Sequence, residues 1–317
     1  MMSGSLAHPH PVAFRNRQGL RLFGVLHTPE GRRQSDVAIL LLSPGVKMRV
    51  GPQCLYRRMT EMFVAQGFSV LRFDFFGLGD SEGRLPEENL KEVYGHIEIG
   101  RFVDDTVDAM NWMQEHHGAR KFVVSGLCGG AITGLLAASR DERIAGLLGL
   151  GITPLLASRA ADPSTYFSAG QLAHLRKGYI SKLLNPKAWL RLLSFRSDYR
   201  VIVKSLLNPL QKKLRKPPLA ADLPVQDDDA SPMFPPAFFA MARSGRPMLL
   251  IFGGSDRLRW DFEEKFVARH QARLHGLEDR YHVHVIPHAN HVLSFEPWQA
   301  EMLTVSRDWL RRHFMSA

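Results

Sequence analysis

Apolar residues along the first half of the chain form two kinds of pattern. Four mainly apolar runs predict strands, and the uninterrupted run 37–42 is typical of a strand buried on both faces. These runs are residues 37–42, 68–76, 121–125 and 144–152. Helical spacing of apolar residues, or a run of small residues, predicts helices at 53–66, 97–117 and 131–139. The alternation indicates an α/β fold with a mostly parallel central sheet flanked by helices, after an antiparallel hairpin near 12–14 and 20–27.

The alternation stops at Pro154 and resumes near residue 246. Residues 155–245 have a helical pattern interrupted by Asn-Pro and Pro-Pro pairs. Strands at 247–252 and 281–286 then alternate with helices at 261–274 and 297–314. We therefore predict a core built from residues 1–154 and 246–317, with a helical cap insertion at 155–245.

Composition limits the class of protein. The 317 residues are 45% hydrophobic and 23% charged, which is ordinary for a globular protein and excludes wholesale disorder, a collagen-like chain and a coiled coil. The longest nearly uncharged apolar stretch, 144–157, is too short to cross a bilayer. Residues 1–19 lack the apolar block of a signal peptide, and two cysteines argue against a disulfide framework. We expect a soluble protein of the reducing cytoplasm.

The formal net charge of +10 is concentrated in one segment. Residues 171–217 contain 12 lysines and arginines but one acid, Asp198. Within this segment, residues 187–216 resemble a basic amphipathic helix. It could line an acyl-chain tunnel, contact an anionic membrane peripherally, or bind an acidic carrier protein or the phosphates of coenzyme A. A cap packed on the core with a solvated basic face remains the alternative. Nucleic acid is not an expected partner, because no binding motif is recognisable.

The strongest chemical signal is the sequence Gly126-Leu127-Cys128-Gly129-Gly130, between a predicted strand and a small-residue helix. A nucleophile elbow needs this context, because its glycines allow a sharp turn and close packing of strand on helix. Cys128 is thus the candidate nucleophile, and the helix N-terminus would stabilise its thiolate. The backbone N–H of Gly129 is a candidate oxyanion donor. A buried, inert cysteine is the competing interpretation.

A second segment, residues 79–83, also matches the G-x-S-x-G pattern. It follows its strand only after Gly77-Leu78-Gly79, and it leads into Arg84-Leu85-Pro86 rather than an apolar helix. We interpret it as a structural loop, with Ser81 as a minor alternative nucleophile.

An acid and a base should follow the elbow in that order. Asp256 ends a strand and is the candidate acid that would orient a histidine, with Asp261 as its rival and a helix N-cap as the plain structural alternative. His291 lies just before the final helix and is the candidate base, with His288 as the alternative.

The second oxyanion donor should lie in the loop after the strand at 37–42. The backbone N–H of Val46 is the candidate, and Lys47 is next. We expect no cofactor and no bound metal.

These motifs, in this order, resemble the α/β-hydrolase superfamily over the whole chain except the insertion. The cysteine elbow is shared with dienelactone hydrolases and polyhydroxyalkanoate synthases. A closer resemblance is to the bacterial α/β-hydrolases associated with exosortase systems, which have similar segments. The matching segments here are Arg49-Val50-Gly51, Arg72-Phe73-Asp74, Gly79-Asp80-Ser81 and Gly126-Leu127-Cys128. Pro44-Gly45 replaces the typical His-Gly, and the basic insertion is not part of the superfamily core.

The resemblance implies an acyl-transfer enzyme with a Cys-His-Asp triad, which hydrolyses an ester or thioester through an acyl-cysteine. An acyltransferase with an alcohol, amine or thiol acceptor is the first alternative, because thioester intermediates are readily intercepted. The second alternative is a non-catalytic protein of this fold that binds a lipid or a partner. The substrate stays open, since this fold supports many chemistries.

Overall fold

The structure is a computed structural model that describes residues 9–30, 35–156 and 230–315. Most of the predicted insertion 155–245, including the basic segment 187–216, lies outside the described residues. The predictions for that segment, an acyl tunnel, an anionic membrane, an acidic carrier protein or coenzyme A, therefore stay predictions. The described C-terminal end of the range forms helix α8 (Phe234–Arg243), which packs against helix α4 (Gly129–Ala138) of the core.

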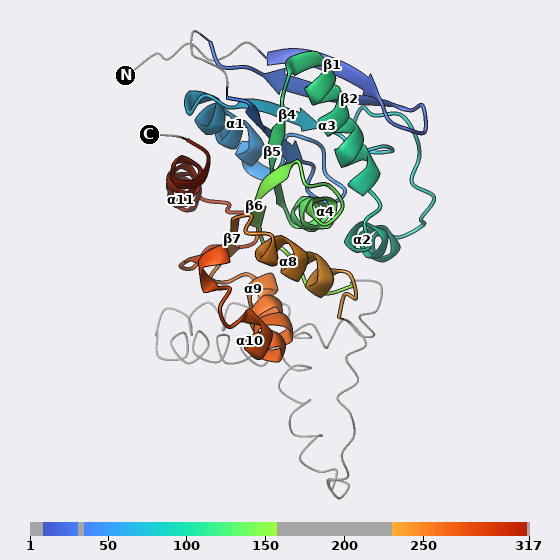
Figure 1. Ribbon diagram of the computed structural model, residues 1–317. Helices are drawn as coiled ribbons and strands as arrows, with labels where there is room; N and C mark the ends of the chain where they lie inside the picture. Colours follow the sequence, from blue (N-terminus) through green and yellow to red (C-terminus); the bar gives the residue numbers. More distant parts are fainter. Residues whose placement is uncertain (1–8, 31–34, 157–229, 316–317) are drawn as a thin grey trace, which may run out of the picture. The chain divides into compact units, whose positions relative to one another are not determined.

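One eight-stranded sheet organises the described residues, in the order β1-β2-β4-β3-β5-β6-β7-β8 (Figure 1). The first two strands form the predicted antiparallel hairpin, β2 also pairs antiparallel with β4, and every other neighbouring pair is parallel. The strands are β1 (Pro9–Arg15), β2 (Arg21–His27), β3 (Val37–Leu42), β4 (Ser69–Phe73), β5 (Lys121–Leu127), β6 (Ile144–Leu150), β7 (Met248–Gly253) and β8 (Tyr281–Ile286). The predicted mostly parallel α/β sheet is therefore confirmed.

Helices cover both faces of this sheet (Figure 1). One face carries α1 (Leu55–Ala65) and α11 (Glu296–Phe314), which contact each other. The other carries α2 (Leu90–Glu98), α3 (Val103–His117), α4 (Gly129–Ala138) and α8, followed by α9 (Arg257–Phe262) and α10 (Ala268–Leu274). The central strands β3, β4 and β7 are buried along their whole length, because helices exclude water from both of their faces.

The single helix predicted at 97–117 is wrong. The chain forms α2 and α3 instead, and Gly100 between them has a φ of +105°. A side chain rarely adopts this conformation, so the helix ends there although the apolar spacing continues across it. The break matters because α2 runs beside the elbow of Cys128. The helix predicted at 261–274 is likewise divided into α9, a π-helical turn at Glu263–Val267, and α10.

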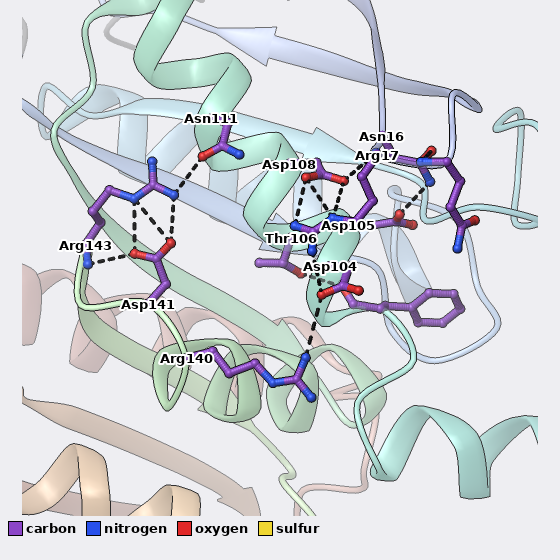
Figure 2. Close-up of polar contacts among 12 residues, drawn as sticks. Asn16, Arg17, Asp104, Asp105, Thr106, Asp108, Asn111, Arg140, Asp141 and Arg143 are labelled. Carbon is purple, nitrogen blue, oxygen red and sulfur yellow. Dashed lines mark hydrogen bonds and ion pairs between the residues drawn. The ribbon is translucent and has the colours of Figure 1, made fainter.

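The hairpin is attached to the rest of the sheet domain through α3 (Figure 2). Buried Asp105 accepts hydrogen bonds from the Asn16 side chain and from the N–H of Phe76, both at 2.8 Å. Burial raises the pKa of Asp105, although these two hydrogen bonds act in the opposite direction. One turn further along α3, Asp108 pairs with the half-exposed Arg17 at 3.0 Å. The buried contact of Asp105 with Asn16 and the exposed contact of Asp108 with Arg17 thus both attach the hairpin turn to α3.

Candidate active site

Cys128 occupies a strained turn between β5 and α4. Its φ of 54° and ψ of −113° are unusual for a residue with a side chain. The turn closes tightly enough that a Cβ on Gly126 would lie 2.5 Å from the carbonyl carbon of Gly130, and a Cβ on Gly130 would lie 2.4 Å from the Leu42 oxygen. Both positions therefore require glycine, as expected for a nucleophile elbow.

The structure brings Asp256 and His291 together at the ends of β7 and β8. Oδ2 of Asp256 lies 2.8 Å from Nδ1 of His291, and Oδ1 accepts the N–H of Leu258 at 3.0 Å. Asp256 is thus the N-cap of α9 and at the same time a hydrogen-bond partner of His291. With Nδ1 facing the carboxylate, Nε2 is the ring nitrogen left for Cys128, whose side chain lies close enough to raise the pKa of His291.

The electrostatics of this chain favour a charged imidazole. Burial alone would lower the pKa of His291, but the hydrogen bonds and charges of Asp256 and Cys128 outweigh it and raise that pKa to about 10. The carboxylate is itself only 4% exposed, which limits the screening of its charge by water. Asp256, His291 and Cys128 therefore form a continuous polar chain suited to a thiolate–imidazolium pair.

Glycines allow the three loops to approach, and sequence reasoning missed the nearest one. Gly151, directly after β6, has a φ of +53°, and a Cβ there would lie 2.8 Å from Cε1 of His291 and 3.2 Å from Oδ2 of Asp256. A Cβ on Gly253 would lie 2.4 Å from the Ala289 oxygen. The N–H of Ser255 donates to that same oxygen at 2.9 Å, so the acid loop and the histidine loop are joined through their backbones. No motif in the sequence distinguishes Gly151 from its neighbours.

The residues predicted as alternatives to the base, the acid and the nucleophile are exposed or have other partners. His288 is exposed, and buried Asp261 pairs with Arg257 at 3.0 Å. The hydroxyl of Ser81 donates to the Asp74 carbonyl at 2.6 Å and accepts the N–H of Phe23 at 2.9 Å. Ser81 thus ties its loop to β2, in agreement with the expected structural loop.

The loop that carries the predicted donor Val46 meets the elbow that carries the predicted donor Gly129. A Cβ on Gly129 would lie 2.7 Å from Cα of Gly45, so the loop after β3 touches the start of α4. Gly129 is the first residue of α4, where N–H groups lack partners within the helix. Lys47 is less suitable, because its N–H already donates to the Pro44 carbonyl at 3.1 Å. The backbone of Val46 lies near the hydroxyl of Tyr94, a residue that belongs to no motif of the sequence.

Among residues 9–30, 35–156 and 230–315, no group of three or more histidine, cysteine, aspartate or glutamate side chains is placed to hold a metal ion. In the same part of the chain, no helix is both long enough and apolar enough to cross a bilayer.

Comparison with known proteins identifies the family. The sequence matches the profile of the alpha/beta hydrolase family over residues 49–301. The chain belongs to this family. The match confirms the expected α/β-hydrolase fold and the expected hydrolase-type enzyme. No curated protein sequence matches the chain.

Solved structures share the α/β-hydrolase fold at low sequence identity. An esterase of Pyrococcus furiosus has a TM-score of 0.59 at 15% identity, over 98% of this chain and 94% of the esterase. A dienelactone hydrolase of Anabaena variabilis has a TM-score of 0.56 at 15% identity, over 98% of this chain and 99% of the hydrolase. A hypothetical protein of Pseudomonas aeruginosa has a TM-score of 0.60 at 16% identity, over 99% of this chain and 96% of that protein. At this identity the likeness establishes the fold alone.

Proposed function

We propose that this α/β-hydrolase cleaves an ester or thioester through an acyl-cysteine on Cys128, with His291 as base and Asp256 as orienting acid. One observation carries the proposal: His291 is held by Asp256 on Nδ1 at 2.8 Å, while its other side meets a cysteine on a strained elbow. The resemblance to exosortase-associated hydrolases and to dienelactone hydrolases supports cysteine in this role. The esterase named among the solved structures supports an acyl substrate.

The first half of the reaction forms the acyl-enzyme. Cys128 transfers its proton to Nε2 of His291, and Asp256 stabilises the resulting imidazolium. The thiolate sulfur forms a bond to the substrate carbonyl carbon, and the carbonyl π electrons move to oxygen. When that oxyanion collapses, the bond to the leaving group breaks and the leaving group takes the proton from His291. The raised pKa of His291 supports a charged imidazole before attack.

The second half releases the acyl group. His291, neutral again, removes a proton from water, and the hydroxide oxygen attacks the acyl-thioester carbon. Collapse of this second oxyanion releases a carboxylic acid and returns the thiolate with a protonated His291. An alcohol, amine or thiol in place of water would give acyl transfer, so the identity of the acceptor separates the hydrolase from the acyltransferase.

Intact-mass measurement after brief exposure to acyl thioesters and activated esters tests the proposal. We expect an added acyl mass on the wild-type protein and on Cys54→Ala, which removes the exposed second cysteine, but none on Cys128→Ala. The lifetime of the adduct in water would distinguish hydrolysis from transfer. An adduct that persists in Cys128→Ala, or the absence of both adduct and product with every donor, would overturn the proposal and favour a binding protein.

A further inference from the structure

The side chain of Tyr94 lies against the loop that carries Val46. A Cβ on Gly45 would lie 2.7 Å from Cε1 and 2.8 Å from Oη of Tyr94, so glycine alone fits beneath this ring. Gly45 also has a φ of +62°, which disfavours a side chain for a second reason. The phenol thus reaches the point where the loop after β3 meets the elbow.

The hydroxyl of Tyr94 lies beside groups of the proposed acyl-transfer site. It is near the backbone of Val46, and it is close enough to Cys128 to respond to that residue's charge. Partial burial and a Cys128 thiolate both raise the pKa of Tyr94, and the nearby Val46 backbone only partly opposes them. The phenol therefore keeps its proton at neutral pH, and its O–H is a donor.

The phenol lies where two of the candidate donors meet. A Cβ on Gly45 would lie 2.8 Å from Oη of Tyr94, and a Cβ on Gly129 would lie 2.7 Å from Cα of Gly45. An oxyanion beside the phenol could therefore accept the O–H of Tyr94 together with the N–H of Gly129.

We propose that the Tyr94 hydroxyl is a further direct hydrogen-bond donor to the oxyanion, beside the backbone N–H groups of Gly129 and Val46. The inference rests on the proposed acyl-cysteine chemistry and adds a catalytic residue to it. Tyr94 keeps its proton throughout: it donates a hydrogen bond as negative charge develops on the substrate oxygen, and His291 alone transfers protons.

Helix α2 is anchored firmly enough to hold the phenol in position. Its N-terminus is capped by Asn89, whose side chain accepts the N–H of Glu92 at 3.0 Å. Glu87, just before the helix, is hydrogen-bonded by Arg101, just after it. Ile97, one turn beyond Tyr94, is fully buried, and its Cγ2 would lie 3.2 Å from a Cβ on Gly129. The same helix therefore packs on the elbow and presents the phenol to it.

Two rates measured on the Tyr94→Phe protein test the inference. Acylation of Cys128 by a thioester develops an oxyanion, whereas its alkylation by iodoacetamide does not. Loss of one oxyanion donor should slow acylation about 100-fold, while alkylation keeps the wild-type rate. Tyr281→Phe is the matched control, because it removes a tyrosine hydroxyl at the first residue of β8 and should change neither rate.

Three results would overturn the inference in distinguishable ways. Wild-type acylation of Tyr94→Phe would remove Tyr94 from the oxyanion site and leave the acyl-cysteine proposal intact. Equal slowing of acylation and alkylation would mean that Tyr94 controls the reactivity of Cys128 rather than the oxyanion. A wild-type protein that forms no adduct with any acyl donor, yet is alkylated at Cys128, would end the proposed function, and the inference would end with it.

Discussion

At the residue scale, glycine occupies the positions where the loops of the site come closest. Gly126 and Gly130 let β5 turn into α4, Gly253 lets the acid loop touch the histidine loop, and Gly151 lies against the His291–Asp256 pair. In each case a Cβ would stand closer to its neighbour than atoms allow. The geometry of the polar groups thus depends on glycine, which has no Cβ, at these positions.

Gly151→Ala should damage the site more than the fold. The new Cβ would lie 2.8 Å from His291 and would push the imidazole out of line with Asp256 and Cys128. A displacement of about 1 Å at a catalytic group can cost about 100-fold in rate, so we expect a loss of that order in kcat/KM for an ester substrate.

Gly118→Ala is the control for backbone strain alone. Gly118 has a φ of +66°, close to the +53° of Gly151, but a Cβ there meets no atom within 4 Å. Both substitutions force alanine into the left-handed backbone region, which lowers the free energy of unfolding by about 1–2 kcal/mol in each variant. Equal losses of activity in the two variants would show that strain, and not contact with His291, controls the result.

His291 should make stability depend on pH in alkaline solution. The pKa of His291 rises from 6.5 to about 10 in the folded chain. The stability that the charged imidazole contributes is therefore complete below pH 6.5 and is lost as the pH rises through about 10. The free energy of unfolding, measured with urea, should therefore fall between about pH 7 and about pH 10 by more in the wild type than in His291→Gln.

His288→Gln provides the matched control, since it removes an exposed histidine from the same loop. It should keep the pH dependence of the wild type. An identical alkaline loss of stability in His291→Gln and wild type would mean that the imidazolium does not contribute to folding stability.

How much of this site the sequence predicts depends on whether a residue belongs to a motif. Cys128, Asp256 and His291 each follow a predicted strand in a known order, so their approach could be expected before any coordinates. Tyr94 and Gly151 belong to no such pattern. They are noticed because a ring or a Cα lies close to a neighbouring loop, and the folded chain alone defines that distance.

At the element scale, Tyr56 of α1 joins the ends of the two strands that carry the site. Its buried hydroxyl donates to the Leu42 carbonyl at the end of β3 at 2.7 Å and accepts the N–H of Leu127 at the end of β5 at 2.8 Å. The loop with Val46 follows the first strand and Cys128 follows the second. This hydroxyl therefore helps to set the spacing between the elbow and the loop that carries Val46.

Tyr56→Phe should lower both stability and activity. Without the hydroxyl, a buried N–H and a buried carbonyl lose a partner, which costs about 1–3 kcal/mol in the free energy of unfolding. Looser strand ends should also reduce kcat more than KM, because the spacing matters most when the oxyanion forms. Urea unfolding and steady-state kinetics measure the two effects, and Tyr281→Phe again serves as the control. A stable, fully active Tyr56→Phe would contradict this role.

Element boundaries were the least predictable part of the fold. The strands predicted at 37–42 and 281–286 have the predicted bounds, and each is followed by a residue that ends the pattern, Ser43 in one case and Pro287 in the other. The helix expected at 97–117 was wrong because apolar spacing continues through Gly100, where the backbone changes conformation. Apolar spacing reports which face is buried, but it does not report where the backbone turns. As a result the spacing hid the helix that carries Tyr94.

At the scale of the whole molecule, the hairpin β1–β2 extends the sheet beyond its parallel part, and α3 holds it there (Figure 1). Asp105 joins the hairpin turn, through Asn16, to the loop after β4, through Phe76. Asn16 in turn accepts the N–H groups of Gln18 and Leu20 and so orders the turn. One buried carboxylate thus connects three separate parts of the chain.

Asp105→Ala should therefore loosen the hairpin as a unit. It leaves the Asn16 amide and the Phe76 N–H without their acceptor, which should lower the free energy of unfolding by about 2–4 kcal/mol. Hydrogen exchange of the β1 and β2 amides should rise beyond what global unfolding explains. Asp108→Ala, one turn along the same helix, removes a pair with Arg17, which is 47% exposed, and should cost no more than about 1 kcal/mol. If the two substitutions lower the free energy of unfolding equally, burial does not determine the strength of this attachment. The hairpin must then be held by its apolar contacts, such as the stacking of Phe14 on Trp112, whose ring centroids are 5.5 Å apart.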